Sequence, residues 1–174
     1  MNPPHTGGYP GRVEIAEMLD AARRRLADAP RERLGEYVPV RRILGIPRAA
    51  RVVPVGEAWH LGVLLLAADA LLATGDIVRA REEVRRGFTA QSQRERAALA
   101  GAARRGGFAE GETVHVGWTP IDVDAVAQGA ASGPLALVDG VPSVRWSRTG
   151  GFTPLRGYLD EHVALLRDPP AGAT

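Results

Sequence analysis

Prolines and paired glycines divide this chain of 174 residues into short segments, and their spacing limits the elements that it can form. Because Pro39, Pro47 and Pro54 interrupt residues 30–58, we expect turns and short extended pieces there rather than a helix. Three other segments show helical periodicity and are followed by a proline or a glycine pair. They are residues 13–29, 91–105 and 154–167.

The apolar residues 59–68 fit two different structures. Their alanine and leucine content is typical of a helix, whereas Gly62 and the short length of the segment favour a strand. We predict a β-hairpin with Asp69 in its turn and a second, kinked strand through residues 71–81. One long helix is the alternative.

Alternation and turn residues predict further strands in the second half of the chain. Residues 112–118 alternate between the two faces of a strand, and Asp139–Gly140 separates two apolar segments as in a tight hairpin. The sequence predicts one α+β domain over residues 12–168, with a mostly antiparallel sheet of five or six strands packed against three helices. Residues 1–11 are expected to form a flexible arm, and residues 169–174 a tail.

Two residue types are missing from the sequence, and their absence excludes several chemistries. Without cysteine the chain cannot form disulfides, cysteine-based zinc sites or thiol nucleophiles. Without lysine it cannot use a Schiff base, a Ser-x-x-Lys nucleophile or a Walker-A loop. We expect no cofactor and no metal site, and the cysteine-free composition fits the cytoplasm.

The apolar segments are also too short for a membrane partner. The longest, residues 61–68 with a near continuation at 70–73, falls short of the roughly 20 apolar residues that a membrane-spanning helix needs. The first residues show no apolar core of a secretion signal. We therefore expect no membrane interaction.

All 22 lysine-or-arginine residues are arginine, and ten of them form three clusters within residues 79–86, 94–105 and 145–148. Arginine beside tryptophan can bind an anionic ligand or a nucleic-acid backbone. The alternative is a solvated basic surface, because 20 carboxylates nearly cancel the charge. The candidates for contact with an anionic partner are Arg79, Arg81, Arg145 and Trp146, with Arg85, Arg86, Arg94, Arg96, Arg104, Arg105 and Arg148 nearby in the sequence.

Two histidines in predicted strands are the weaker, catalytic candidates. His60 and His115 could meet across a sheet and form an acid–base site with Asp122 or Asp124. The alternative is two unrelated histidines and a carboxylate that caps a short helix. Ser92 has the spacing of a helix cap, so we do not interpret it as a nucleophile.

Six short segments within residues 51–170 carry a resemblance to known proteins. They are Val55–Trp59, Leu61–Leu65, Ala73–Gly75, Arg105–Phe108, Gly111–Val114 and Val144–Trp146. In these segments the chain resembles a family of short proteins from high-GC Gram-positive bacteria, some of which carry the label glutaminase. The resemblance implies hydrolysis of an amide and a strand over residues 71–81. It brings no site residue, because the known glutaminase types use Ser-x-x-Lys or a cysteine.

These observations predict a non-catalytic binding domain whose arginine and tryptophan surface contacts an acidic protein or an anionic ligand. One alternative is a small amide hydrolase that works without a lysine or a cysteine. The other is a weak nucleic-acid binder, whose affinity would fall steeply with salt.

Overall fold

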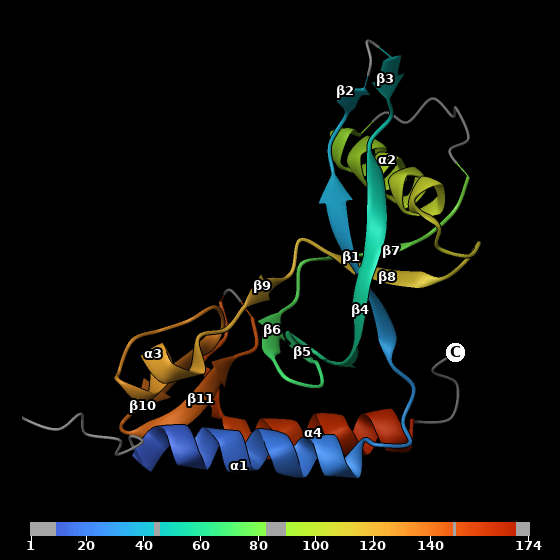
Figure 1. Ribbon diagram of the computed structural model, residues 1–174. Coiled ribbons are helices and arrows are strands. Elements are labelled where there is room, and N and C mark those ends of the chain that lie inside the picture. The colour runs from blue at the N-terminus through green and yellow to red at the C-terminus, as the bar shows by residue number, and fades with distance from the viewer. Residues whose placement is uncertain (1–9, 44–45, 83–89, 148, 170–174) are drawn as a thin grey trace, which may run out of the picture. The chain divides into compact units, whose positions relative to one another are not determined.

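The computed structural model has an α+β fold, as the sequence predicts, and describes residues 10–43, 46–82, 90–147 and 149–169 (Figure 1). The helices of this part of the chain are α1 (Pro10–Arg25), α2 (Gln91–Gly106), α3 (Val123–Ala127) and α4 (Leu155–Arg167). The strands are β1 (Glu32–Val38), β2 (Arg41–Ile43), β3 (Ile46–Arg48), β4 (Arg51–Leu61), β5 (Leu64–Leu66), β6 (Leu71–Ala73), β7 (Asp76–Arg79), β8 (Thr113–Val116), β9 (Thr119–Pro120), β10 (Leu135–Val138), β11 (Val141–Arg145) and β12 (Phe152–Pro154).

The strands outnumber the five or six expected, because turns divide several of the predicted segments. The largest sheet has the order β7-β8-β1-β4-β5-β6-β9, and β10-β11-β12 and β2-β3 form two smaller ones. In the largest sheet, the pairs β7–β8, β1–β4, β4–β5 and β5–β6 are antiparallel as predicted, whereas β1 and β8 run parallel and make the sheet mixed. No helix in the described ranges is long and apolar enough to cross a bilayer.

The chain forms two compact units, each built from separate segments. Unit 1 comprises residues 1–30, 59–73 and 120–174, and unit 2 comprises residues 31–58 and 74–119. Each unit has an apolar core of its own.

The core of unit 1 joins three helices to short strands. Helices α1 and α4 contact each other, as do α1 and α3 (Figure 1). The sequence predicts the buried stripe of α4 correctly, since the periodic apolar positions of this helix face the core. The fully buried core residues include Ile15, Leu26, Leu61, Leu64, Leu66, Val126, Leu135, Val144, Leu155 and Val163.

Unit 2 contains β1, β2, β3, most of β4, β7, β8 and helix α2. Val114 and Val116 of β8 pack with the small residues of α2, and Phe108, just after the helix, is buried in the same core. A Cβ atom at Gly35 of β1 would lie 2.3 Å from a methyl group of Val52, so glycine permits this close packing. Helix α2 ends as predicted, with Gly107 in the left-handed conformation at a φ of 111°.

Residues 59–73 form hairpins, and the alternative of one long helix is wrong. The predicted strand over residues 59–68 is divided by a turn at Gly62, whose φ of +64° favours glycine. A second turn carries Asp69, as expected, and joins β5 to β6. The predicted strand over residues 71–81 is likewise divided into β6 and β7.

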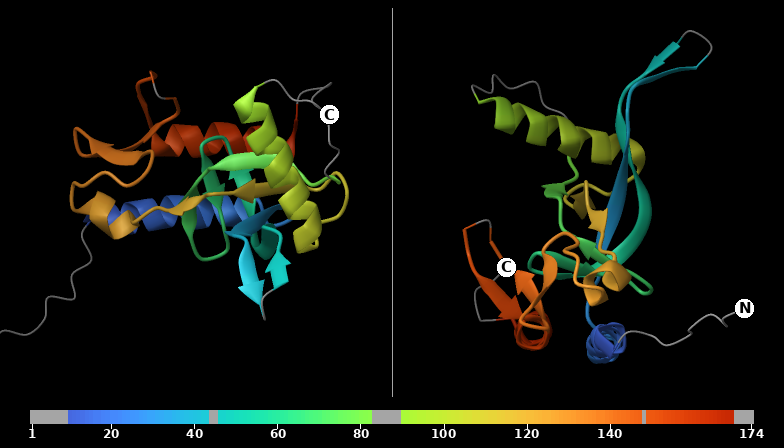
Figure 2. Two further views of the ribbon diagram at one scale, coloured as in Figure 1. Left: turned by 90° about the horizontal axis from the view of Figure 1, so that it is seen from above. Right: turned by 90° about the vertical axis from the view of Figure 1, so that its left-hand side faces the viewer.

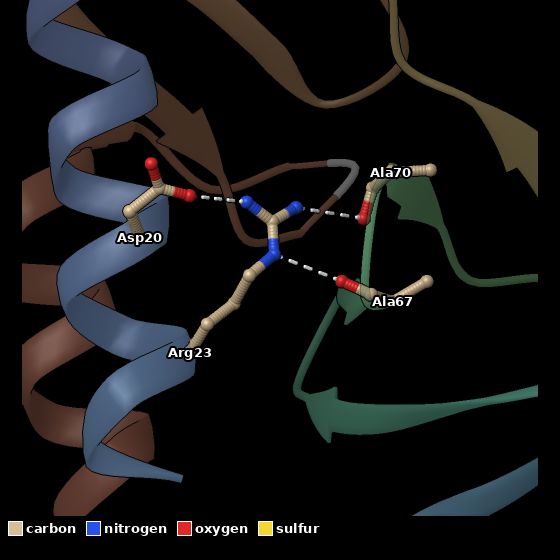
Figure 3. Close-up of polar contacts among 4 residues, drawn as sticks. All are labelled: Asp20, Arg23, Ala67 and Ala70. Atoms are coloured by element: carbon tan, nitrogen blue, oxygen red, sulfur yellow. Dashed lines mark hydrogen bonds and ion pairs between the residues drawn. The ribbon is translucent and has the colours of Figure 1, made fainter. Parts of the chain in front are cut away.

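Arg23 of α1 holds the turn between β5 and β6 (Figure 3). Its guanidinium donates to the carbonyl oxygen of Ala67 at 3.0 Å and to that of Ala70 at 3.4 Å. Asp20, one helical turn earlier, accepts a third hydrogen bond at 2.8 Å and orients the guanidinium. One arginine thus satisfies two turn carbonyls.

One helix start and one helix cap differ from the predictions. Helix α1 begins at Pro10, inside the predicted flexible arm, because proline suits the first position of a helix; residues 1–9 lie outside the described residues. The predicted Ser92 cap of α2 is wrong. The helix begins at Gln91, as its periodicity predicts, but Ala90 holds the cap position without a side-chain bond, and Gln91 bonds Glu95 instead.

Candidate functional site

The formal charge is distributed unevenly between the two units. Unit 2 contains 14 arginines and nine carboxylates and carries +5, whereas unit 1 contains eight arginines and 11 carboxylates and carries −3. The net charge of +2 for the whole sequence is the sum of these two opposite charges. A basic unit of this kind attracts anionic partners.

Arg79 and Arg81 lie at the edge of the sheet in unit 2. Strand β7 is the first strand in the sheet order, and Arg79 is its last residue. Both side chains are exposed, and neither makes an ion pair with a residue that the structure describes. The backbone of Arg81 is fixed by a hydrogen bond from its N–H to the carbonyl oxygen of Ala100 in α2. The nearby Arg85 and Arg86 lie outside the described residues.

The first half of helix α2 adds two further arginines to this unit. All residues from 91 to 96 are exposed, and the buried residues of the helix are confined to 100–103. Arg94 and Arg96 therefore lie on a part of the helix that solvent surrounds. Arg104, near the C-terminal end, instead pairs with Glu110 at 3.5 Å.

A second arginine surface lies on the three-stranded sheet of unit 1. Arg145 of β11 pairs with Phe152 of β12, and its guanidinium carbon lies 4.7 Å above the centre of the phenyl ring. Trp146 follows with 56% of its surface exposed, and Phe152 is 37% exposed. Arg145 makes no ion pair among the described residues, so its charge is available to a partner. Arg148 lies outside the described residues.

His115 of unit 2 is fully buried and bonded to a carboxylate that the sequence did not single out. Its Nε2 atom bonds Glu32 Oε2, and the Glu32 side chain is 38% exposed. Strands β1 and β8 run parallel and pair Leu34 with His115, which brings Glu32, two residues earlier, to the same face. A carboxylate that orients an imidazole is the arrangement of a general base, and both groups are also metal-ligand types.

His60 belongs to unit 1, in a cluster of polar residues beside the Gly62 turn. Its Nε2 atom lies 2.9 Å from the carbonyl oxygen of Gly62, and the rings of Tyr158 and His162 lie 4.1 Å apart. Burial lowers the pKa of His162, and the nearby His60 lowers it further, against the opposing effect of Glu161. Burial likewise raises the pKa of Tyr158.

The two aspartates proposed beside the histidines have structural uses. The Asp122 side chain caps α3 by accepting a hydrogen bond from the N–H of Ala125 at 2.9 Å, which confirms the alternative interpretation of that residue. Asp124 pairs with Arg12 at 2.7 Å. A site that combines His60, His115 and Asp122 remains a prediction.

The serine hydroxyls of unit 1 also bond the backbone. Ser132 accepts from the N–H of Asp122, Ser147 accepts from that of Gly150, and Ser143 donates to the carbonyl oxygen of Val141. Ser92 is exposed on α2. None of these contacts pairs a serine with a histidine.

Unit 1 also has a small pocket near the C-terminal ends of α1 and α4. Its volume is about 160 Å³. That is below the several hundred Å³ of a typical site for a drug-sized ligand. Its lining residues are Arg25, Asp28, Ala29, Pro30, Leu166 and Arg167.

No protein-family model, no curated protein and no solved structure matches this chain. The resemblance to short proteins of high-GC Gram-positive bacteria therefore stays a prediction.

Proposed function

We propose that this protein is a non-catalytic binding domain of the cytoplasm and that its basic unit 2 contacts an acidic partner. The observation that carries this proposal is the group of exposed arginines on unit 2, led by Arg79 and Arg81, that form no ion pair among the described residues. An unpaired exposed arginine can bind a carboxylate or a phosphate without first breaking a salt bridge. The excess charge of unit 2 adds long-range attraction to these local contacts.

Charge reversal on β7 tests this proposal with poly-L-glutamate as the acidic probe. We expect R79E/R81E to weaken binding by about tenfold or more at low salt, since each exposed charge pair contributes up to about 1 kcal/mol. The matched control is R24E/R156E, which makes the same change of charge at exposed positions of unit 1. Equal affinity of the wild type and R79E/R81E would overturn the proposal, as would a wild type that does not bind.

The aromatic surface of unit 1 offers a second place for an acidic partner. Arg145 supplies a cation beside two exposed rings, and an exposed ring adds apolar contact to the ionic one. W146A and R145Q should each weaken a complex that uses this surface and leave the melting temperature within a few degrees. If both variants form the complex as tightly as the wild type, the complex does not use this surface.

Amide hydrolysis is the second candidate function, and the hydrogen bond between the buried His115 and the half-buried Glu32 is what favours it. In this hypothesis Glu32 orients the imidazole of His115, which removes a proton from the attacking water. Ammonia release from glutamine is the assay, and we expect H115A to abolish it and E32Q to reduce it. If H115A still releases ammonia at the wild-type rate, His115 is not the general base.

A further inference from the structure

Strand β7 is the edge strand of the sheet in unit 2. It pairs with β8 on one side, and no strand of the described residues pairs with its other side (Figures 1 and 2). The side chains of Val78 and Ala80 are buried in the core with helix α2. Because side chains alternate along a strand, Ile77 and Arg79 lie on the opposite face, where both are exposed. Strand β7 thus presents one apolar and one basic side chain to solvent.

The hydrogen bonds after β7 show which of its backbone groups face away from β8. The N–H of Ala80 donates to the carbonyl oxygen of Glu112, and the N–H of Gly111 donates to the carbonyl oxygen of Ala80. The backbone of Ala80 therefore points toward β8, and the alternation of an antiparallel pair directs the N–H and C=O groups of Ile77 and Arg79 outward. These outward groups form no hydrogen bond with a residue that the structure describes. We call the outward backbone groups of Ile77 and Arg79 the open edge.

The open edge ends where helix α2 meets the chain. The N–H of Arg81, the next residue that faces outward, donates to the carbonyl oxygen of Ala100 in α2 at 3.3 Å. Both Arg79 and Arg81 are exposed without an ion pair in the described ranges, and the residue opposite Arg79 on β8 is the uncharged Thr113. Two positive charges therefore accompany the open edge.

An extended peptide matches the backbone groups of the open edge. The groups of Ile77 and Arg79 lie two residues apart, about 7 Å along the strand, and each residue offers one donor and one acceptor. A further strand supplies the complementary carbonyl oxygens and N–H groups at the same spacing. A DNA backbone carries phosphate acceptors and no donor, so it leaves the outward carbonyl oxygens without a partner.

The charges determine which side chains that strand carries. A second copy of β7 would bring two more arginines to the edge, and like charges on neighbouring strands destabilise the pair. A carboxylate opposite Arg79 forms an ion pair instead, and an apolar side chain opposite Ile77 covers a residue that is 40% exposed. The open edge therefore fits a strand with an acidic and an apolar side chain two residues apart.

We propose that the acidic partner of unit 2 is an extended peptide segment that adds to β7 as a further, antiparallel strand. This inference rests on the proposed function and names the form of the partner. The open edge holds the backbone of the segment, Arg79 and Arg81 bind its carboxylates, and helix α2 limits it at one end.

Hydrogen exchange at the amides of Ile77 and Arg79, followed by NMR of the full chain, tests this strand addition. The probe is a synthetic peptide about eight residues long, with a glutamate two positions before a valine and threonine elsewhere. We expect saturating peptide to slow the exchange of both amides by about tenfold or more, because strand pairing protects their N–H groups. The amide of Val78, which already faces β8, is the internal control and should change little.

N-methylation of the peptide separates backbone pairing from attraction between charges. Methyl groups on the nitrogens of its glutamate and its valine remove both donors to β7 and change no charge. We expect this peptide to bind about tenfold or more weakly, since two hydrogen bonds are lost. The matched control carries its methyl groups on the adjacent threonines, whose N–H groups face away from β7, and should bind like the parent peptide.

Ile77→Pro makes the corresponding change in the protein. It removes one outward N–H and leaves every charge in place, and proline is tolerated in an edge strand where its nitrogen faces solvent. We expect I77P to keep the protection of β8 and to bind the parent peptide several-fold more weakly. The control I77V keeps the N–H and should bind like the wild type.

The outcomes separate this inference from the proposed function. If the parent and the N-methylated peptide bind equally, or if the amides of Ile77 and Arg79 keep their exchange rates, strand addition is wrong; the basic surface stands when R79E/R81E still weakens binding of poly-L-glutamate. Protection of these amides that rises with protein concentration without peptide identifies a second copy as the occupant and contradicts the inference. A wild type that binds neither the peptide nor poly-L-glutamate overturns both proposals.

Discussion

Two polar side chains in unit 1 stabilise turns that lie far from them in the sequence. The Tyr158 hydroxyl donates to the carbonyl oxygen of Leu61 at 2.9 Å and accepts from the N–H of Val63 at 2.8 Å. Arg23 binds the next turn of the same segment. A buried or half-buried turn needs such partners, because an unpaired backbone group costs about 1–3 kcal/mol.

Replacing Arg23 by alanine should lower the free energy of unfolding by about 1–3 kcal/mol, because two turn carbonyls lose a charged donor. Arg24→Ala is the matched control, since this neighbouring side chain is exposed. Urea denaturation measures both variants. Equal stabilities of the two would show that the contacts of Arg23 contribute little.

Tyr158→Phe should destabilise the chain by about 1–3 kcal/mol through the loss of one hydroxyl group. The ring stays in the core, so the loss reports on the two backbone groups of the Gly62 turn rather than on packing. Hydrogen exchange at the N–H of Val63 should rise in parallel. Unchanged protection there would contradict this role.

His162 should make stability depend on pH. Because burial lowers its pKa from the ordinary value of 6.5, the unfolded chain binds more protons in mildly acidic solution. Stability is therefore fully present above about pH 6.5 and declines as the pH falls toward the lower pKa of the folded state. We expect H162Q to lose less stability than the wild type over that range in urea denaturation at a series of pH values. Parallel curves of stability against pH for H162Q and the wild type would contradict this expectation.

At the scale of elements, local patterns predicted the α+β class and several of the turns. Asp139–Gly140 forms the expected turn, with φ values of 50° and 79°, because this dipeptide tolerates the left-handed conformation. The Ser92 cap failed because Ser92 lies inside the helix, one residue after its start, where the Ser-x-x-Glu spacing alone does not mark a cap.

The Glu32–His115 pair was only half predictable. Histidine in an alternating segment indicated a candidate, but its partner comes from β1, more than 80 residues earlier. Parallel pairing of β1 with β8 is a property of the tertiary fold, and no local pattern near Glu32 signals it. Strands β2 and β3 were not predicted, because Pro39 and Pro47 interrupt this part of the sequence.

Helix α4 contains a position where a single change should stabilise the protein. Gly157 lies within the helix, and an added Cβ atom would meet no other atom within 4 Å. Gly157→Ala should therefore raise stability by about 0.5–1 kcal/mol, since glycine is a poor helix former. Gly35→Ala makes the same chemical change in β1 and should destabilise, because Val52 occupies the space. Thermal unfolding of both variants tests this contrast.

At the scale of the whole molecule, each core collects segments from distant parts of the chain. The core of unit 1 contains residues from the first, middle and last parts of the chain, so this core is incomplete until α4 is present. Non-local cores of this kind fold more slowly than local ones.

Deletion of residues 155–174 tests this dependence. The deletion removes Leu155, Tyr158, Leu159 and Val163 from the core of unit 1 and none of the core of unit 2. Hydrogen exchange measured by mass spectrometry should show lost protection in α1 and retained protection in β8. Full protection of α1 in the shortened chain would contradict the prediction.

The interleaved order of the segments has a mechanical consequence. The first and the last described residues both belong to unit 1, and the helices that follow and precede them, α1 and α4, contact each other. Tension applied at the two ends of the chain therefore acts first across that helix pair. Unit 2 lies between these two helices along the chain, so a molecule held by both ends leaves it without load until α1 or α4 detaches.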